Sequence, residues 1–491
     1  MTICHRSLLL VAGSLLTTAL ACAGSTSRVS ANGAAAGPFG SHDSALVGRL
    51  LLAEDRRDST DVSLGEAAAH PDERVRVLSR RARARIGDPL FAARDSFPMA
   101  APQVVWPEPA WRLRYRALAD RRGDCGALRT ALTDGVWAVR LRALGFIAAA
   151  CASDDALAGT LRQWIDAIPQ GPSLRQAGGV SWHAAAHSVV ALARVRPAEA
   201  RPRVRALMTH PQWQVRAYAA RAAAVLADTI VLRTLVRDAD DNVKEAAIDA
   251  LAKLTPSDHG VFVSALGSSG AQAVRAAAVA LKGATHPDVL SAVTAALERW
   301  TARSNASERD VRVALLEAAG RPARDDRPPL PRYELPPRTV ALALGADVRL
   351  RVRIAPASGG GSFVVRLRGD VAPVMAARIL ALVRSGYYDG LDWHRVEHDF
   401  VIQGGTPGSN EYVGSPQYLR DELGMVPHAR GTVGMSTRGH DTGDAQWFVN
   451  LKDNLRLGRD YTVFAEVVEG MDVVDGIMEG DVIAAIEEIG R

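Results

Sequence analysis

A short phrase that recurs along the chain limits its fold more than any other feature. Between residues 70 and 320, a polar turn is followed by an apolar residue, then by Arg or Lys, then by an alanine-rich stretch. The phrase occurs as Val75-Arg76, Trp111-Arg112, Val139-Arg140, Val215-Arg216, Val243-Lys244, Val274-Arg275 and Val311-Arg312. Successive apolar positions are 36, 28, 76, 28, 31 and 37 residues apart, and the long step leaves room for a diverged copy near Trp182-His183. A period near 30 residues predicts one helical hairpin per repeat.

Each repeat contains apolar residues at roughly helical spacing, for example Val243, Ala246, Ile248 and Leu251. One hairpin cannot bury its apolar face alone, so neighbouring hairpins are expected to share a core. The pattern resembles HEAT-type repeats and implies an α-solenoid over residues 43–320. Such arrays usually present binding surfaces, which predicts a protein partner or client for this region. A spacer without a partner and an array that binds an acidic partner are the alternatives.

The amino terminus predicts export. His5 and Arg6 precede an apolar run from Leu8 to Ala21, which is too short to span a bilayer because a spanning helix needs about 20 residues. The run ends in Ala-Leu-Ala followed by Cys22, which resembles a bacterial lipoprotein signal. The resemblance implies that residues 1–21 are removed and that Cys22 is lipidated. Cleavage near Ala21 without lipidation is the alternative.

Residues 22–42 are rich in Ser, Gly and Ala and are expected to form a flexible tether. The expected location is therefore the bacterial cell envelope, with the protein held at a membrane by its lipid anchor and facing the periplasm or exterior. Two of the four cysteines, Cys125 and Cys151, lie among the repeats. They fit a disulfide in an oxidising compartment and fit two separate buried thiols equally well.

Composition excludes several classes of protein. At 491 residues, with 48% hydrophobic and 23% charged residues, the chain is a globular protein of two or three domains and is not disordered. Four cysteines are too few for a disulfide-rich scaffold. The arginines are spread at helical intervals without a dense basic block or interleaved aromatic residues, so nucleic acid is not an expected partner.

The pattern changes after residue 320. Six prolines within residues 321–338 end the helical array and predict a semi-rigid linker. Beyond it, Val348, Leu350, Val352 and Ile354 alternate with arginines, as in a half-buried strand. Strands are also predicted at 363–368, 432–435, 446–451, 462–468 and 482–489, with a helix from about residue 373 to Gly386. Many short strands with few helices predict a closed antiparallel β-barrel over residues 339–491.

Several motifs in this last region, in matching order and spacing, resemble a cyclophilin-type peptidyl-prolyl cis-trans isomerase. They are the segments 384–390 (RSGYYDG), 393–405 (WHRVEHDFVIQGG), 430–435 (RGTVGM), 445–450 (AQWFVN), 461–464 (YTVF) and 467–471 (VVEGM). The resemblance implies a cyclophilin-type fold for residues 339–491 and an X-Pro polypeptide as substrate.

The resemblance also implies roles for single residues. Arg395 corresponds to the family's catalytic arginine, and Gln403 is expected to act beside it by holding the substrate carbonyl or orienting the guanidinium. The expected substrate-binding residues are Phe400, Val401, Met435, Ser436, Thr437, Gln446, Phe448, Leu457 and Tyr461. This sequence departs from the best-known family pattern at several of these positions and nearby: Val401, Thr437, Trp447, Arg456 and Tyr461.

These residue types suit rotation about a prolyl bond. Rotation breaks amide resonance, with a barrier of about 18–20 kcal/mol, and leaves a lone pair on the prolyl nitrogen. An arginine beside that nitrogen can donate a hydrogen bond that exists only in the twisted state. Phe400 and Phe448 would hold the proline ring. Rotation requires no nucleophile, so no metal or cofactor is expected. His394 is expected to be structural because the reaction transfers no proton.

The predicted function is a peptidyl-prolyl cis-trans isomerase that assists folding of envelope proteins, with the repeats binding clients or a partner. The alternative is an adaptor that binds proline-containing peptides with little or no turnover. Retention of Arg395 and Gln403 favours the enzyme, whereas the changed rim keeps the adaptor open.

Overall fold

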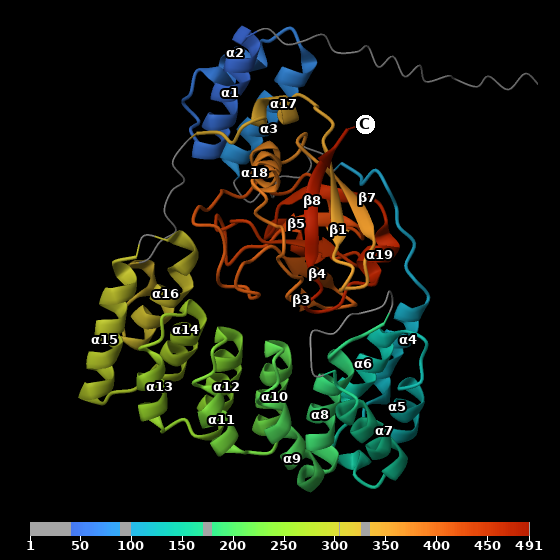
Figure 1. The fold of residues 1–491 in the computed structure, drawn as a ribbon. Coiled ribbons are helices and arrows are strands. Elements are labelled where there is room, and N and C mark those ends of the chain that lie inside the picture. The colour runs from blue at the N-terminus through green and yellow to red at the C-terminus, as the bar shows by residue number, and fades with distance from the viewer. Residues whose placement is uncertain (1–40, 89–99, 170–178, 304, 326–333, 491) are drawn as a thin grey trace, which may run out of the picture. The chain divides into compact units, whose positions relative to one another are not determined.

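The structure is a computed structural model that describes residues 41–88, 100–169, 179–303, 305–325 and 334–490. Residues 42–491 form one compact unit, in which a helical region precedes a curled antiparallel sheet (Figure 1). The predicted signal, residues 1–21, and nearly all of the predicted tether lie outside the described residues. No helix in the described ranges combines the length and apolar character needed to cross a bilayer.

The region before the C-terminal domain is helical. Its helices are α1 (Ser41–Arg56), α2 (Ser63–Ala68), α3 (Glu73–Gly87), α4 (Trp111–Ala117), α5 (Cys125–Ala131), α6 (Trp137–Phe146), α7 (Asp155–Asp166), α8 (His183–Val195), α9 (Pro197–Leu207), α10 (Trp213–Val225), α11 (Thr229–Leu235), α12 (Asp241–Leu254), α13 (His259–Ala265), α14 (Ala271–Ala280), α15 (Pro287–Thr301) and α16 (Arg309–Ala318). Short 3-10 turns lie at Leu118–Arg121, Ala149–Cys151, Ala306–Glu308 and Ala323–Asp325. Helix α8 begins at the position where the spacing predicts a diverged copy.

The cation of the recurring phrase has a structural role. Nη1 of Arg76 donates to the carbonyl of His70 at 2.6 Å, and Nη1 of Arg216 donates to the carbonyl of His210 at 2.8 Å. Arg140 makes the same bond to a carbonyl six residues before it. In these three copies the cation therefore satisfies a backbone carbonyl of the turn that precedes its helix.

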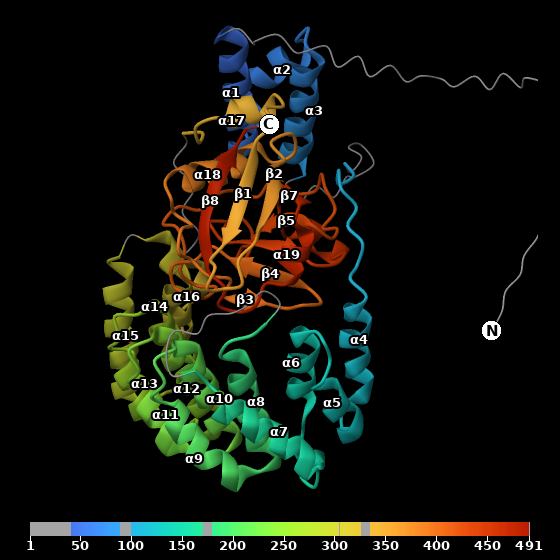
Figure 2. The same ribbon diagram turned by 45° about the vertical axis from the view of Figure 1, so that its right-hand side comes forward.

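The repeat helices pack in series, with α8, α10, α12, α14 and α16 each contacting the next (Figure 2). One hydrophobic core extends from Tyr115 to Ala318 and also includes Met478 from the C-terminal domain. Cys125, at the start of α5, and Cys151, in the turn before α7, form a disulfide with Cα atoms 5.4 Å apart. This resolves the two alternatives left by the sequence in favour of the disulfide.

Helices α1–α3 lie outside that core and contact the C-terminal domain instead. Nη2 of Arg85 donates to the carbonyl of Val371 at 2.8 Å, and the amide of Ala100 donates to the carbonyl of Met425 at 2.7 Å. The indole of Trp106 packs against the domain's core and donates to a backbone carbonyl there. The repeat period does not predict this contact, because it treats residues 43–320 as one array.

The C-terminal domain contains the predicted strands and helix. The strands are β1 (Arg349–Ile354), β2 (Ser362–Leu367), β3 (Arg395–Val396), β4 (Val401–Gly404), β5 (Thr432–Met435), β6 (Trp447–Asn450), β7 (Val463–Glu469) and β8 (Ile483–Ile489). The helices are α17 (Thr339–Ala343), α18 (Pro373–Arg384) and α19 (Met471–Asp475). Strands β3 and β4 were not predicted as strands. Helix α18 begins with proline at its first position and packs against β7 and β8.

The expectation of a closed barrel is wrong. The strands form one antiparallel sheet in the order β3-β4-β6-β5-β7-β2-β1-β8, and its two end strands are not paired with each other. Strand β3 has only two residues, and the segment before it meets the segment before β8 at the isolated bridge between Asp392 and Val482. The sheet therefore curls around its core as a half-barrel. Alternating apolar residues predict strands but do not determine whether the last strand returns to the first.

Candidate functional site

A cavity of about 110 Å³ opens beside β3, β4 and β6 and contains most of the predicted site. We call it the proline cavity. Its lining residues are Arg395, Phe400, Val401, Gln403, Glu411, Ser436, Thr437, Arg438, Phe448, Leu457 and Tyr461. The predicted positions that line the cavity lie between residues 395 and 461. Antiparallel pairing of β4 with β6 places Gln403 opposite Phe448.

One side of the proline cavity is apolar. Val401, Phe448 and Leu457 form a small buried cluster that is separate from the main core of the domain. Phe400 and Tyr461 pack against this cluster, and the Tyr461 ring lies edge-on to Phe448 with centroids 5.6 Å apart. A recess of this size lined by aliphatic and aromatic side chains suits a small apolar ring.

Gly434 gives the Phe448 ring its space. Gly434 lies directly opposite Phe448 in the β5–β6 register. A Cβ atom at this position would lie 2.8 Å from Cε2 of Phe448 and closer still to Cζ. Only a residue without a side chain lets the ring lie flat against β5, so the shape of the apolar recess depends on this glycine.

His428 supports the same ring from the other side. The imidazole stacks on Phe448 with centroids 5.7 Å apart, and its side chain is fully buried. Nε2 lies 2.9 Å from the carbonyl of Tyr461, and Nδ1 lies 3.1 Å from the side-chain amide of Asn450. Burial lowers the pKa of His428 to about 4, although the bond to Tyr461 opposes that shift. The neutral imidazole with a proton on Nε2 fits both contacts.

The other side of the proline cavity is polar and centres on Gln403, whose side chain is buried. Its Nε2 donates to Oγ of Ser436 at 3.0 Å and to Oε1 of Gln446 at 3.2 Å, while its Oε1 accepts from Nη1 of Arg395 at 3.4 Å. Gln446 in turn donates to the carbonyl of Glu411. These bonds hold the Gln403 amide with its oxygen toward Arg395, as expected of a residue that orients the guanidinium.

Arg395 lies at the rim and is held by two carboxylates. Glu397 accepts from Nε at 2.8 Å and Glu411 accepts from Nη1 at 2.9 Å. Burial disfavours the charge of Arg395, but these two partners outweigh it and raise the pKa of Arg395 above its ordinary value. The guanidinium also lies 5.9 Å from the centroid of the Phe400 ring. A permanent cation with its donors beside an apolar recess is the arrangement that prolyl rotation requires.

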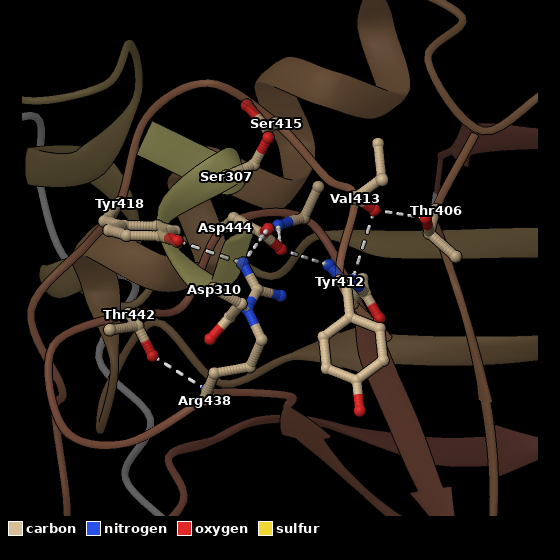
Figure 3. A network of polar contacts seen from close by, with 12 residues as sticks. Ser307, Asp310, Thr406, Tyr412, Val413, Ser415, Tyr418, Arg438, Thr442 and Asp444 are labelled. Carbon is tan, nitrogen blue, oxygen red and sulfur yellow. Dashed lines mark hydrogen bonds and ion pairs between the residues drawn. The ribbon is translucent and has the colours of Figure 1, made fainter. Parts of the chain in front are cut away.

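A polar network fixes the loop that supplies Glu411 (Figure 3). Arg438 donates to the carbonyl of Glu411 at 2.8 Å and to the hydroxyl of Tyr418 at 3.0 Å. It also forms ion pairs with Asp444 and with Asp310 of α16, and the latter contact joins the repeat helices to the rim of the cavity. The position of Glu411 therefore depends on both parts of the chain.

Three predicted residues lie elsewhere. Gln446 does not line the proline cavity but contacts it through Gln403. Met435 does not line it either. The Met435 side chain belongs to the main core of the domain. Successive residues of a strand face opposite sides of the sheet, so Met435 faces away from the side on which the Phe448 ring packs against Gly434. Cys22 lies outside the described residues. Burial lowers the pKa of His394 to about 3, so this imidazole is neutral at physiological pH, as a structural residue would be.

Four residues of the site were not predicted: Glu411, His428, Gly434 and Arg438. Gly434 falls within the quoted motif at 430–435, and its place opposite Phe448 follows once the strands are paired. Glu411 and Arg438 lie in loops without regular periodicity, and Asp310 is more than 100 residues from both in the sequence. Only the folded chain brings these three together.

Comparison with known proteins finds relatives of the C-terminal domain, which contains the proline cavity. Residues 351–488 match the model of a family described as cyclophilin type peptidyl-prolyl cis-trans isomerase/CLD. A peptidyl-prolyl cis-trans isomerase of Helicobacter pylori is 30% identical over 162 residues, which cover 32% of this chain and 94% of that relative. Peptidyl-prolyl cis-trans isomerase B of Escherichia coli is 36% identical over 128 residues, which cover 24% of this chain and 78% of the relative. The crystal structure of a cyclophilin type isomerase from Cryptosporidium parvum covers 30% of this chain and 99% of its own, with 21% identity and a TM-score of 0.28.

Proposed function

The chain belongs, through its C-terminal domain, to the cyclophilin-type peptidyl-prolyl cis-trans isomerases, and we propose that it isomerises X-Pro bonds of envelope proteins while anchored by a lipid. The observation on which the proposed mechanism depends is the position of Arg395. Its guanidinium borders the same cavity as the apolar cluster of Val401, Phe448 and Leu457. A proline ring held in the recess would place its nitrogen toward the polar side.

The proposed mechanism stabilises the twisted amide. As the C–N bond loses its double-bond character, the prolyl nitrogen becomes pyramidal and can accept a hydrogen bond from Arg395. The planar amide has no such lone pair, so the bond lowers the energy of the transition state alone. Gln403 orients the guanidinium through the 3.4 Å contact to Nη1. The apolar cluster anchors one side of the bond while the other side rotates.

This mechanism is tested by Arg395→Ala in the full chain. We expect kcat/KM for a proline tetrapeptide to fall about 100-fold, by analogy with loss of one donor to a developing charge. The matched control is Arg384→Ala, which removes an exposed arginine of α18 paired with Glu488 and should leave turnover unchanged. Equal turnover by Arg395→Ala and the parent would remove Arg395 from the mechanism.

The proposed location depends on Cys22 and on the Cys125–Cys151 disulfide. Disulfides persist in oxidising compartments such as the periplasm, so the pairing of Cys125 with Cys151 supports export. Metabolic labelling with palmitate tests lipidation directly. The parent is expected to incorporate label and Cys22→Ser is expected to lose it, whereas equal labelling would contradict the anchor at Cys22.

We also propose that α4–α16 form a HEAT-like solenoid that binds client polypeptides or a protein partner. Support comes from the serial packing of α8, α10, α12, α14 and α16 around one core, and from the period near 30 residues. The tether at 22–42, the linker at 321–338 and the isomerase domain at 339–491 remain part of this proposal. Of the solenoid expected at 43–320, the proposal keeps α4–α16, because α1–α3 lie outside the shared core.

An adaptor with little turnover is the second candidate. The observation that favours it is the pairing of Arg395 with Glu397 and Glu411, which occupies the guanidinium before any substrate arrives. An adaptor would bind a proline peptide with the same affinity in Arg395→Ala and would show background turnover in the parent. Measurable turnover by the parent, lost in the variant, would exclude this candidate.

A further inference from the structure

A larger cavity adjoins the proline cavity, and we call it the flanking cavity. Its volume is about 680 Å³, against about 110 Å³ for the proline cavity. Arg395 and Glu411 line both, so the two cavities meet at this ion pair. On one side the flanking cavity is bounded by repeat helices α10, α12 and α14. On the other it is bounded by the C-terminal domain, including the loop of residues 409–412.

Most of the wall formed by the repeat helices comes from the adjacent helices α10 and α12, and α14 adds Gln272 and Arg275. Helix α12 contributes residues separated by three or four positions, which therefore share one face: Asn242, Glu245, Ala246, Asp249, Ala250, Lys253 and Leu254. Helix α10 contributes Trp213, Ala217, Arg221 and Ala224 in the same way. Asp249, Lys253 and Leu254 are exposed, so this face is not buried against another element. Small apolar residues alternate with long charged ones along it.

Contacts between the two walls fix the width of the flanking cavity. The Asn242 side chain donates to the carbonyl of Gly408 at 3.1 Å. The guanidinium of Arg275, on α14, lies 3.8 Å from the centroid of the Tyr412 ring. Tyr412 follows Glu411 directly, and Glu411 lines both cavities. Through Asn242 and Arg275, the repeat helices therefore contact the segment that separates the two cavities.

We infer that the flanking cavity binds the unfolded polypeptide segment next to the prolyl bond, so that the repeat helices form part of the substrate site. The inference rests on the proposed function of the proline cavity. A polypeptide whose proline occupies that cavity must continue beyond it, and the space beyond Arg395 and Glu411 is the flanking cavity. The continuity of the two sites therefore identifies the occupant.

The chemistry of the lining fits an unfolded chain of mixed sequence. The cations Arg221, Lys253, Arg275 and Arg395 are matched by the carboxylates Glu245, Asp249, Glu411 and Glu479. A balanced lining does not select a strongly acidic or strongly basic ligand. Alanines between the charged residues leave room for a backbone to approach the helices. This surface therefore suits an extended segment that contains both polar and apolar side chains.

The test compares substrates of two lengths in the full chain. A proline tetrapeptide extends only a residue or two beyond the proline cavity, whereas a fluorescent unfolded peptide of about 20 residues with one central proline is long enough to occupy both cavities. Asp249→Trp and Lys253→Trp narrow the flanking cavity at exposed positions, where folding tolerates change. Glu298→Trp, at an exposed position of α15 that does not line the cavity, is the matched control. Turnover gives KM for both peptides, and fluorescence anisotropy gives Kd for the long one.

We expect both cavity variants to raise KM and Kd of the long peptide at least fivefold, with kcat/KM for the tetrapeptide within twofold of the parent. The control should behave as the parent does. An equal effect on both lengths, or none on the long peptide, would overturn the inference. An inactive parent would disprove the proposed enzymatic function. The role of the flanking cavity would still be decided by the ratio of the Kd values of the variants and the parent for the long peptide, because anisotropy needs no turnover.

Discussion

The carboxylate of Glu411 lies 2.9 Å from Nη1 of Arg395, so the guanidinium that borders the proline cavity is paired in the free protein. A substrate nitrogen has to share or displace this partner when it accepts a hydrogen bond from Arg395. Glu397 holds Nε of the same guanidinium, which keeps the side chain in place when Glu411 is removed. The two acids therefore act differently, although each forms an ion pair with Arg395.

Glu411→Gln is expected to raise kcat/KM for a proline tetrapeptide about two- to fivefold. Exposed ion pairs contribute about 0.2–1 kcal/mol, and this is the free energy that the substrate no longer has to overcome. Steady-state kinetics of the full chain at low salt provide the measurement. Glu397→Gln is the comparison and should not raise activity, because Glu397 orients the guanidinium. A fall in activity for Glu411→Gln would show that Glu411 assists the reaction.

Gly434→Ala is expected to damage the proline cavity. Its Cβ would approach the Phe448 ring to 2.8 Å or less, so the ring must move into the recess. We expect KM for a proline peptide to rise about tenfold, together with a loss of about 1–3 kcal/mol in the free energy of unfolding from overpacking. Gly65→Ala, in α2 with no atom within 4 Å of the added methyl, is the control. Parent-like kinetics for Gly434→Ala would show that Phe448 does not shape the recess.

The lowered pKa of His428 predicts that the free energy of unfolding falls in acid. Its pKa is about 4 in the folded protein and about 6.5 in an unfolded chain, so between these values the unfolded chain binds a proton that the folded protein does not. The neutral His428 side chain therefore makes its full contribution to the free energy of unfolding above pH 6.5, and this contribution is lost as the pH falls toward 4. At pH 5 the loss is about 2 kcal/mol.

Denaturant unfolding of the full chain at pH 7 and pH 5 measures this effect. His428→Gln cannot titrate, so its free energy of unfolding should fall less between the two pH values than that of the parent. His286→Gln, which replaces an exposed histidine at the start of α15, is the control for the substitution itself. The prediction fails if His428→Gln and the parent lose equal stability on acidification.

The disulfide is expected to stabilise the repeat helices. The two cysteines are 26 positions apart, and closing a loop of that length stabilises a protein by about 3.5 kcal/mol in the chain-entropy model. The double variant Cys125→Ala, Cys151→Ala should therefore unfold at a lower temperature than the parent. Reductant should lower the midpoint of the parent and leave the double variant unchanged. An equal response of both proteins to reductant would contradict the pairing.

The sequence predicts the strands β1, β2, β5, β6, β7 and β8 and names most of the residues that line the proline cavity, because both depend on local patterns. Arginine at 395 and phenylalanine at 448 stand within motifs, and alternation identifies β1 from a run of six residues. The open sheet, where a closed barrel was expected, the docking of α1–α3 and the ion pair between Arg438 and Asp310 were not predicted. Each of these depends on which distant segments meet, and neither periodicity nor propensity contains that information.

Arg112 shows how one copy of the recurring phrase departs from the others, and it gives the last prediction. In the copies at Arg76, Arg140 and Arg216 the cation bonds a carbonyl six residues earlier. Arg112 instead is fully buried and donates to the carbonyl of His398 at 2.8 Å and to Asp475 at 2.7 Å. Removal of Arg112 leaves the His398 carbonyl without this donor, whereas Asp475 keeps its ion pair with Arg430. The expected cost is therefore about 1.5–3 kcal/mol. Arg112→Ala should therefore lower the free energy of unfolding by that amount, as measured with denaturant.

Arg140→Ala, at the same position of the phrase, should cost about 1 kcal/mol, since it loses one hydrogen bond to a backbone carbonyl. Equal losses for the two variants would mean that Arg112 serves only its own helix and does not join the repeat helices to the isomerase domain.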